Sequence, residues 1–318
     1  MASFTLADAK KLSDSKLTKY VIDEFRKSPL LDAMVFDDTV KPQGGSSLSY
    51  VYNRVTTLPT AAGRAINTEY TPQEAKTERI TVDLKVFGGS FEIDRVLQAD
   101  ETEVVNLAEF QLQQKIKATR ALFSDWFING DSAADATAFD GLDKALTDSS
   151  TERVLDTVLD LSSAEMVEKN WKAFTYQLRQ VMKLMDGAPT LLCVNPDMFA
   201  VFQSIADFST QYTQTKNELG TEIVKWGNAT IMELGDKPGT SKSIIETSSE
   251  DGTTDIFFTR IGLDGVHGVT PTGSKAPKIY LPDLKTSGAV KKGEVEMVAA
   301  TAMKATRSAA VLRKVKVV

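Results

Sequence analysis

The longest periodic segment of the chain spans residues 104–128, which contain neither proline nor glycine. Apolar side chains recur there at spacings that keep them on one face of an α-helix, at Val105, Ala108, Leu112, Ile116, Phe123 and Trp126. The pattern predicts one helix of roughly 38 Å, at about 1.5 Å per residue. Thr102 is its expected N-cap, and Asn129-Gly130 is its expected left-handed stop.

Two segments before this helix alternate between apolar and polar residues, which is typical of half-buried strands. They are residues 47–56 and residues 78–87. The side chains expected on one face are Leu48, Tyr50 and Tyr52 in the first, and Ile80, Val82, Leu84 and Val86 in the second. Together the segments predict a hairpin. Residues 57–77 between them far exceed the roughly two to five residues of a usual hairpin turn, so we expect an ordered, projecting loop.

The rest of the chain alternates between helical and strand patterns. The predicted helices are residues 163–185 and one that begins at Asn195-Pro196-Asp197, and the predicted strands are residues 190–194, 230–234, 255–261, 294–301 and 309–318. Ser162 or Ser163 caps the first of these helices. Residues 237–254, rich in Gly, Ser and Asp, predict an exposed connection. Residues 8–27 predict a short amphipathic helix near the N-terminal end.

Composition supports a globular chain and narrows its chemistry. With 318 residues, 42% of them hydrophobic, the chain has enough apolar side chains for the core of one large or two interleaved domains. It has no apolar run of membrane-spanning length and no signal-peptide pattern at its start, so neither membrane insertion nor secretion is expected. Cys193 is the only cysteine, which excludes an intrachain disulfide and a CxxC motif. His267, the only histidine, is expected to be structural or exposed.

Charge is uneven along the chain. The net charge is −6, from 37 basic and 43 acidic residues, which argues against general binding of nucleic acid through bulk positive potential. Residues 291–318 differ, because seven basic residues face two acidic ones there, for a local charge of +5. A charged edge strand that resists aggregation explains this excess, and so does a surface that touches phosphate or an acidic neighbour. Both interpretations remain open.

Recognisable catalytic and cofactor motifs are missing from the sequence. The acidic residues within 131–143 lack the D-x-D-x-D-G order and the distal glutamate of a calcium loop. The glycines within 262–268 do not follow the dinucleotide-binding order, and there is no phosphate loop, nucleophile elbow or zinc-binding histidine pair. We therefore expect no catalytic, cofactor-binding or metal-binding residues, and a protein that is not an enzyme.

The order of these elements resembles the major capsid proteins of tailed bacteriophages, which have the Hong Kong 97-type fold. By letter, the resemblance rests on Asn129-Gly130-Asp131, Phe139-Asp140-Gly141-Leu142 and Asn195-Pro196-Asp197. It implies an α+β fold of five segments: an N-terminal arm (1–45), an extended loop hairpin (46–90), a peripheral domain with a long spine helix (91–154), an axial domain (155–289) and a return strand to the peripheral domain (290–318).

The resemblance also implies a function. The chain is expected to assemble with itself, as pentamers and hexamers, into an icosahedral shell around double-stranded DNA, as part of a virion built in the bacterial cytoplasm. A portal protein and a separate scaffolding protein are the expected partners, without a membrane, and the lattice is expected to lock noncovalently. The candidate contacts between subunits are Phe4, Leu12, Phe25, Arg64, Ile66 and Tyr70. The candidate contacts with DNA or a neighbour are Arg313, Lys314 and Lys316.

Two alternatives to this function stay open. An encapsulin-type nanocompartment would keep the fold and enclose an enzyme instead of DNA. A soluble α/β enzyme or binding module is the alternative from a different class. For each apolar contact residue in the arm and the loop, packing within its own subunit is as good an explanation as contact with a neighbour.

Overall fold

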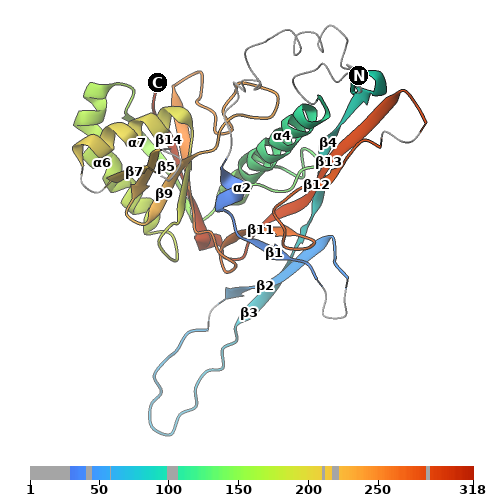
Figure 1. Cartoon of the computed structure of the whole chain (residues 1–318). Coiled ribbons are helices and arrows are strands. Elements are labelled where there is room, and N and C mark those ends of the chain that lie inside the picture. Colours follow the sequence, from blue (N-terminus) through green and yellow to red (C-terminus); the bar gives the residue numbers. More distant parts are fainter. Residues whose placement is uncertain are drawn as a thin grey trace.

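The computed structural model describes residues 29–40, 45–57, 59–98, 107–209, 212–216, 222–283 and 287–318. These residues form two sheets, each covered by helix, and a two-stranded ribbon that projects from the body (Figure 1). The helix predicted at residues 8–27, the cap Thr102 and the arm residues Phe4, Leu12 and Phe25 lie outside the described residues. Among the described residues, no helix has the length and apolarity that a membrane span needs.

The first sheet is organised around one long strand, β13. Its strands are β1 (Phe36–Asp38), β4 (Lys85–Asp94), β11 (Val266–Thr270), β12 (Lys278–Tyr280) and β13 (Val290–Met303). β4 pairs antiparallel with β13 from Lys85↔Ala299 to Asp94↔Val290. β12 pairs with β13 at Glu294, Val295 and Glu296, which are also paired with β4, so β4 and β12 lie on opposite edges of β13.

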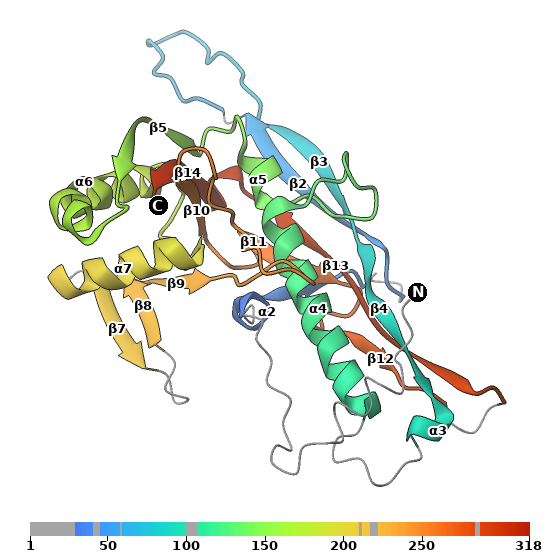
Figure 2. The ribbon, with the colours of Figure 1, turned by 90° about the horizontal axis from the view of Figure 1, so that it is seen from above.

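The long helix α4 (Leu107–Asn129) packs across this sheet, as Figure 2 shows. It confirms the helix predicted from periodicity over the residues that the structure describes. Phe123 and Phe127 on its inner side are fully buried. The Phe123 ring lies 5.9 Å from the ring of Phe36, 6.3 Å from Phe87 and 5.6 Å from Phe139. Aromatic packing therefore joins helix, sheet and the following loop in one core.

The second sheet carries the other core. Its strands, in spatial order, are β5 (Glu152–Asp160), β14 (Ala309–Lys316), β10 (Thr253–Thr259), β6 (Leu191–Val194), β9 (Ala229–Glu233), β8 (Glu222–Trp226) and β7 (Tyr212–Lys216). The helices α6 (Ala164–Met182) and α7 (Pro196–Phe208) pack beside it (Figure 1). Their starts are as predicted, because Ser163 and Asn195 accept hydrogen bonds from the backbone N–H groups of Met166 and Met198.

The ribbon pairs β2 (Ser49–Thr57) with β3 (Lys76–Asp83), which confirms the predicted hairpin. The prediction that its second leg continues to residue 87 was wrong. β3 ends at Asp83, and after Leu84 the chain enters β4, which pairs with β13 instead of β2. Leu84 is only 6% exposed, and its N–H donates to Leu48 O at 2.7 Å. Alternation changes phase at this junction, because Val82 and Leu84 are the more buried residues before it, whereas Phe87, Phe91 and Ile93 are buried in β4. The expectation that Val86 shares a face with Leu84 was also wrong, since Val86 is 55% exposed.

The C-terminal segment also divides between sheets. The two strands predicted at residues 294–301 and 309–318 both form, as β13 and β14, with the short 3₁₀ turn Thr306–Ser308 between them. β13 belongs to the first sheet, whereas β14 lies between β5 and β10 in the second. The division into five named segments stays a prediction.

The helix stop at Gly130 has a different cause from the one expected. Gly130 is not among the residues with positive φ. Instead, Gly141 N–H donates to Gly130 O at 2.8 Å, and this contact brings two backbone segments together. A Cβ on Gly130 would lie 2.1 Å from Phe139 O, and one on Gly141 would lie 2.5 Å from Ile128 O. Glycine is therefore needed at both Gly130 and Gly141, because a side chain at either position would prevent this close contact between the two backbone segments.

Gly141→Ala should destabilise the subunit by roughly 3 kcal/mol, because the added methyl group forces two packed backbone segments apart. Urea unfolding of the unassembled subunit measures the change. Gly63→Ala is the matched control, because its Cβ would meet no atom within 4 Å. That variant should change the free energy of unfolding by less than about 1 kcal/mol. Equal effects of the two substitutions would contradict the close-contact explanation.

Candidate functional site

The tip of the ribbon is the loop of residues 59–75, which projects far from the body of its own subunit (Figure 1). Ile66 is 89% exposed and Tyr70 is 61% exposed. The Arg64 guanidinium lies 5.4 Å from the centroid of the Tyr70 ring, and its Nη1 donates to Thr68 O at 3.1 Å. Sequence reasoning left open whether these side chains pack within their own subunit. The exposure of Ile66 disfavours that explanation, and contact with a neighbour stays a prediction.

Hydrogen bonds across the loop give this tip a defined shape. Thr60 N–H donates to Gln73 Oε1 at 2.7 Å, which closes the neck of the loop. Thr68 N–H donates to Ala65 O at 3.2 Å, and Asn67 between them has a φ of 67°. Asn tolerates this left-handed conformation better than most residues. The loop projects from the body, as its length predicted (Figure 1), and that it is ordered stays a prediction.

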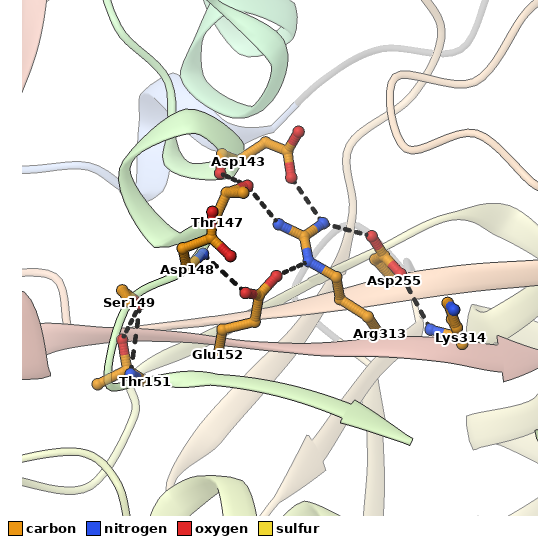
Figure 3. Close-up of polar contacts among 9 residues, drawn as sticks. All are labelled: Asp143, Thr147, Asp148, Ser149, Thr151, Glu152, Asp255, Arg313 and Lys314. Carbon is orange, nitrogen blue, oxygen red and sulfur yellow. Dashed lines mark hydrogen bonds and ion pairs between the residues drawn. The ribbon is translucent and has the colours of Figure 1, made fainter. Parts of the chain in front are cut away.

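Arg313 lies inside a cluster of carboxylates rather than on an open surface (Figure 3). Its Nη1 lies 2.7 Å from Asp143 Oδ1 and 2.8 Å from Asp255 Oδ2, and its Nε donates to Glu152 Oε1. Its Nη2 donates to Thr147 Oγ1 at 2.9 Å. The side chain is 16% exposed. These ion pairs disfavour the expectation that Arg313 faces DNA or a neighbour, because carboxylates of its own subunit already compensate its charge.

The cluster joins elements from both cores. Arg313 comes from β14, Asp255 from β10 and Glu152 from β5, all in the second sheet. Asp143 comes from the short helix α5 (Leu142–Leu146), whose Leu142 and Leu146 are buried in the first core. The ion pairs therefore connect the α4–α5 region to the second sheet.

Within the cluster, burial and the neighbouring charged groups shift the pKa values of Arg313 and Asp255 in opposite directions. Burial acts to lower the pKa of Arg313, but hydrogen bonds to Asp143 and Glu152 outweigh it and raise that pKa. Burial raises the pKa of Asp255, and the nearby Arg313 charge offsets only part of this effect. Three carboxylates thus depend on one guanidinium for compensation, which makes Arg313 the essential member.

Three other basic residues of 291–318 lie in different surroundings. Lys314 is exposed at a bulge with a φ of 65°, where its N–H donates to Asp255 Oδ1 at 3.1 Å. Lys316 Nζ lies 3.8 Å from Asp160 Oδ2. Lys291 is buried, and its Nζ donates to Ser287 O. A contact of Lys314 and Lys316 with DNA or a neighbour stays a prediction.

The acidic loop after α4 is neutralised in a similar way. Lys144 Nζ lies 2.5 Å from Asp131 Oδ1 and 2.8 Å from Asp140 Oδ1. The hydrogen bond from Lys144 is the main cause that lowers the pKa of Asp131. Across the described ranges of the chain, no group of three His, Cys, Asp or Glu side chains is placed to hold a metal ion.

The only cysteine and the only histidine are both core residues. Cys193 is fully buried in β6, and burial raises the pKa of its thiol, which disfavours the reactive thiolate. His267 is fully buried in β11, with its ring 5.6 Å from the ring of Tyr50. Burial is the main cause that lowers the His267 pKa, so the ring is neutral near pH 7.

Arg313→Met should cost roughly 3 kcal/mol of stability at pH 7, at the lower end for a buried pair because Asp143 is partly exposed. Burial already raises the pKa of Asp255, and loss of the Arg313 charge that offsets this effect should raise that pKa further above its unfolded value. Protonation then restores stability as the pH falls, so the deficit should shrink between pH 7 and pH 4. Urea unfolding across this range measures it, with Lys314→Met as the exposed control. A deficit that stays constant with pH would contradict the electrostatic explanation.

Comparison with known proteins shows that other solved structures share this architecture. No family model and no curated protein matches the sequence. The structure is similar to the SrpI encapsulin of Synechococcus elongatus PCC 7942, with a TM-score of 0.64, 13% identity and coverage of 100% of this chain and 97% of that one. It is similar to the capsid of a native GTA particle, with a TM-score of 0.64, 10% identity and coverage of 99% of each chain.

A third similar structure is the capsid of Myoviridae phage XM1, with a TM-score of 0.60, 12% identity and coverage of 94% of this chain and 96% of that one. All three alignments extend over nearly the whole of each chain. The long helix, the projecting ribbon and the two sheets therefore form one complete and known architecture. The chain has the Hong Kong 97-type fold.

Proposed function

We propose that this chain is a structural, shell-forming protein that assembles with copies of itself into an icosahedral capsid around double-stranded DNA. The observation that carries the proposal is the ribbon tip, which projects from the body (Figure 1) and on which Ile66 and Tyr70 are exposed. Burying one such side chain on a neighbour contributes about 1.5–3 kcal/mol. Repeated on every subunit, this modest contact yields a stable lattice, because leaving requires several contacts to break together.

The comparisons support a shell protein by fold. Two of the similar structures are described as capsids and one as an encapsulin complex. In the proposed assembly, pentamers and hexamers of this chain form the shell of a virion, with a portal protein and a separate scaffolding protein as partners. Some capsid proteins of this fold are crosslinked through a lysine of the extended loop. This loop has Arg64 at its tip, and its only lysine, Lys76, lies at its base. We therefore propose that subunits lock without a covalent crosslink.

An encapsulin-type compartment is the second candidate function, and the similarity to the SrpI encapsulin favours it. The two functions share the shell and differ in cargo. DNA demands positive charge on the inner surface to offset phosphate repulsion. Lys314 and Lys316 are the residues that we propose for this role, because Arg313 is already paired with carboxylates of its own subunit.

Ile66→Ser combined with Tyr70→Ser should abolish closed particles while leaving the subunit folded, because it removes apolar burial only at the tip. Negative-stain electron microscopy and thermal unfolding measure the two properties, with the chain produced alone and together with its flanking genes. Tyr176→Ser on α6 is the matched control, because Tyr176 is similarly exposed. Particles of uniform diameter from the tip variant would refute the role of the tip.

Purified particles should contain DNA that resists nuclease until the shell is disrupted. Lys314→Glu combined with Lys316→Glu should lower the DNA content per particle, since it places acid opposite phosphate. Absorbance at two wavelengths and gel electrophoresis of extracted nucleic acid measure this content. Particles that hold one co-purifying protein and no protected DNA would instead support the encapsulin-type function.

A further inference from the structure

Three alternate residues of β2 turn toward the body at the base of the ribbon. Tyr50, Tyr52 and Arg54 are partly buried, whereas Val51 and Val55 on the other face are exposed. A strand places every second side chain on one face. The side chains of Tyr50, Tyr52 and Arg54 therefore lie on one face of β2 and contact the same part of the body.

Beneath them lies the turn that follows β13. Arg54 Nε donates to Lys304 O at 3.0 Å, and its Nη2 donates to Met303 O at 2.5 Å. Its Nη1 donates to Thr306 Oγ1 at 3.3 Å. Tyr52 Oη donates to the same Met303 O at 2.8 Å. One planar guanidinium thus spans the turn with donors in a fixed fork.

Tyr50 adds an attachment to β1 and β11. Its Oη donates to Asp37 Oδ2 at 2.6 Å, and its ring packs edge-on against His267. Lys304 Nζ lies 5.4 Å from the centroid of the Tyr50 ring and 3.8 Å from Asp37 Oδ2. The phenol, carboxylate and ammonium groups form one continuous polar contact.

The turn held in this way is a covalent joint between the two sheets, because it connects β13 of the first to β14 of the second. Residues 260–265, which connect β10 to β11, form another such connection. The position of the turn is fixed from both sides. Lys304 N–H donates to Gly265 O at 3.1 Å, and Arg260 N–H donates to Ser308 O at 2.8 Å. The ribbon is therefore attached to a well-defined point of the body.

The direction of the ribbon at its base determines where its far end lies, because a small rotation at the base becomes a large displacement at the tip. A two-stranded ribbon alone is only marginally stable in water. β3 has 8 residues, which corresponds to roughly 26 Å at about 3.3 Å per residue. A change of about 10° at the base moves the far end by roughly 4.5 Å over that length. This displacement matches the largest separation, about 4.5 Å, at which two apolar side chains are still in contact.

We infer that Tyr50, Tyr52 and Arg54 form an orienting clasp, which sets the direction of the ribbon by holding it to the joint between the two sheets. The importance of this direction for assembly rests on the proposed function, but the clasp is a property of the single subunit. The competing explanation is that the covalent connection through Leu84 and its hydrogen bond to Leu48 set the direction alone.

The distance between the tip and the second sheet, measured on unassembled subunits, tests the clasp. Spin labels on Ile66→Cys and on Glu168→Cys in α6 report this distance by pulsed electron paramagnetic resonance. Cys193 is buried, and treatment of the chain without introduced cysteines checks that Cys193 takes up no spin label. The parent protein should give one narrow distribution of distances. Arg54→Ala should broaden this distribution or shift it by about 4.5 Å, the displacement expected for a change of about 10° at the base.

Two further variants sharpen this measurement. Arg79→Ala on β3 is the control, because Arg79 is exposed on the same ribbon and removal of its charge should leave the distribution unchanged. Arg54→Lys keeps the charge but loses the fork, so it should resemble Arg54→Ala. An unchanged distribution in Arg54→Ala would overturn the clasp, and so would a parent-like distribution in Arg54→Lys.

Assembly is measured separately, so that the two proposals fail independently. If Arg54→Ala disorders the ribbon and also prevents uniform particles, both the clasp and its role in assembly stand. If the ribbon is disordered and particles remain uniform, the role in assembly is overturned. If the parent chain forms no particles under any condition, the proposed function fails while the distance measurement still decides the clasp.

Discussion

The backbone ladder between β4 and β13 is the constraint on which the rest of the structure depends. β4 continues through Leu84 into the ribbon, and β13 continues through a short turn into β14. The same ladder forms the floor on which α4 packs, with Phe87 and Phe123 in ring contact. Ten consecutive pairs from Lys85↔Ala299 to Asp94↔Val290 therefore fix the relation of ribbon, helix and second sheet.

Polar side chains in this protein are concentrated where separate elements must keep a fixed relation. Arg313 connects α5 to three strands of the second sheet, and Arg54 connects β2 to the turn between the sheets. Arg suits both places because its planar fork satisfies several acceptors at once. The function proposed here requires mechanical alignment of many identical subunits, and these contacts supply alignment rather than chemistry.

The charge pattern shows how a linear excess of basic residues differs from a basic surface. Residues 291–318 carry +5, yet Arg313 is surrounded by carboxylates and Lys291 is buried. Desolvating a charge is costly, so buried cations gather partners from distant parts of the chain. Those partners, Asp143 and Asp255 among them, lie far from Arg313 in sequence and were invisible to any local reading.

Local patterns in the sequence predicted the features that depend on near neighbours: the periodic face of α4, the cap Asn195, the cap of α6 as either Ser162 or Ser163, and the unusual length of the loop. They did not determine the change of partner at Leu84 or the burial of Ile244 within a segment expected to be exposed. Periodicity and capping are local, because they involve residues three or four positions apart. Strand partners and ion pairs are chosen across the whole chain, so only the tertiary structure decided them.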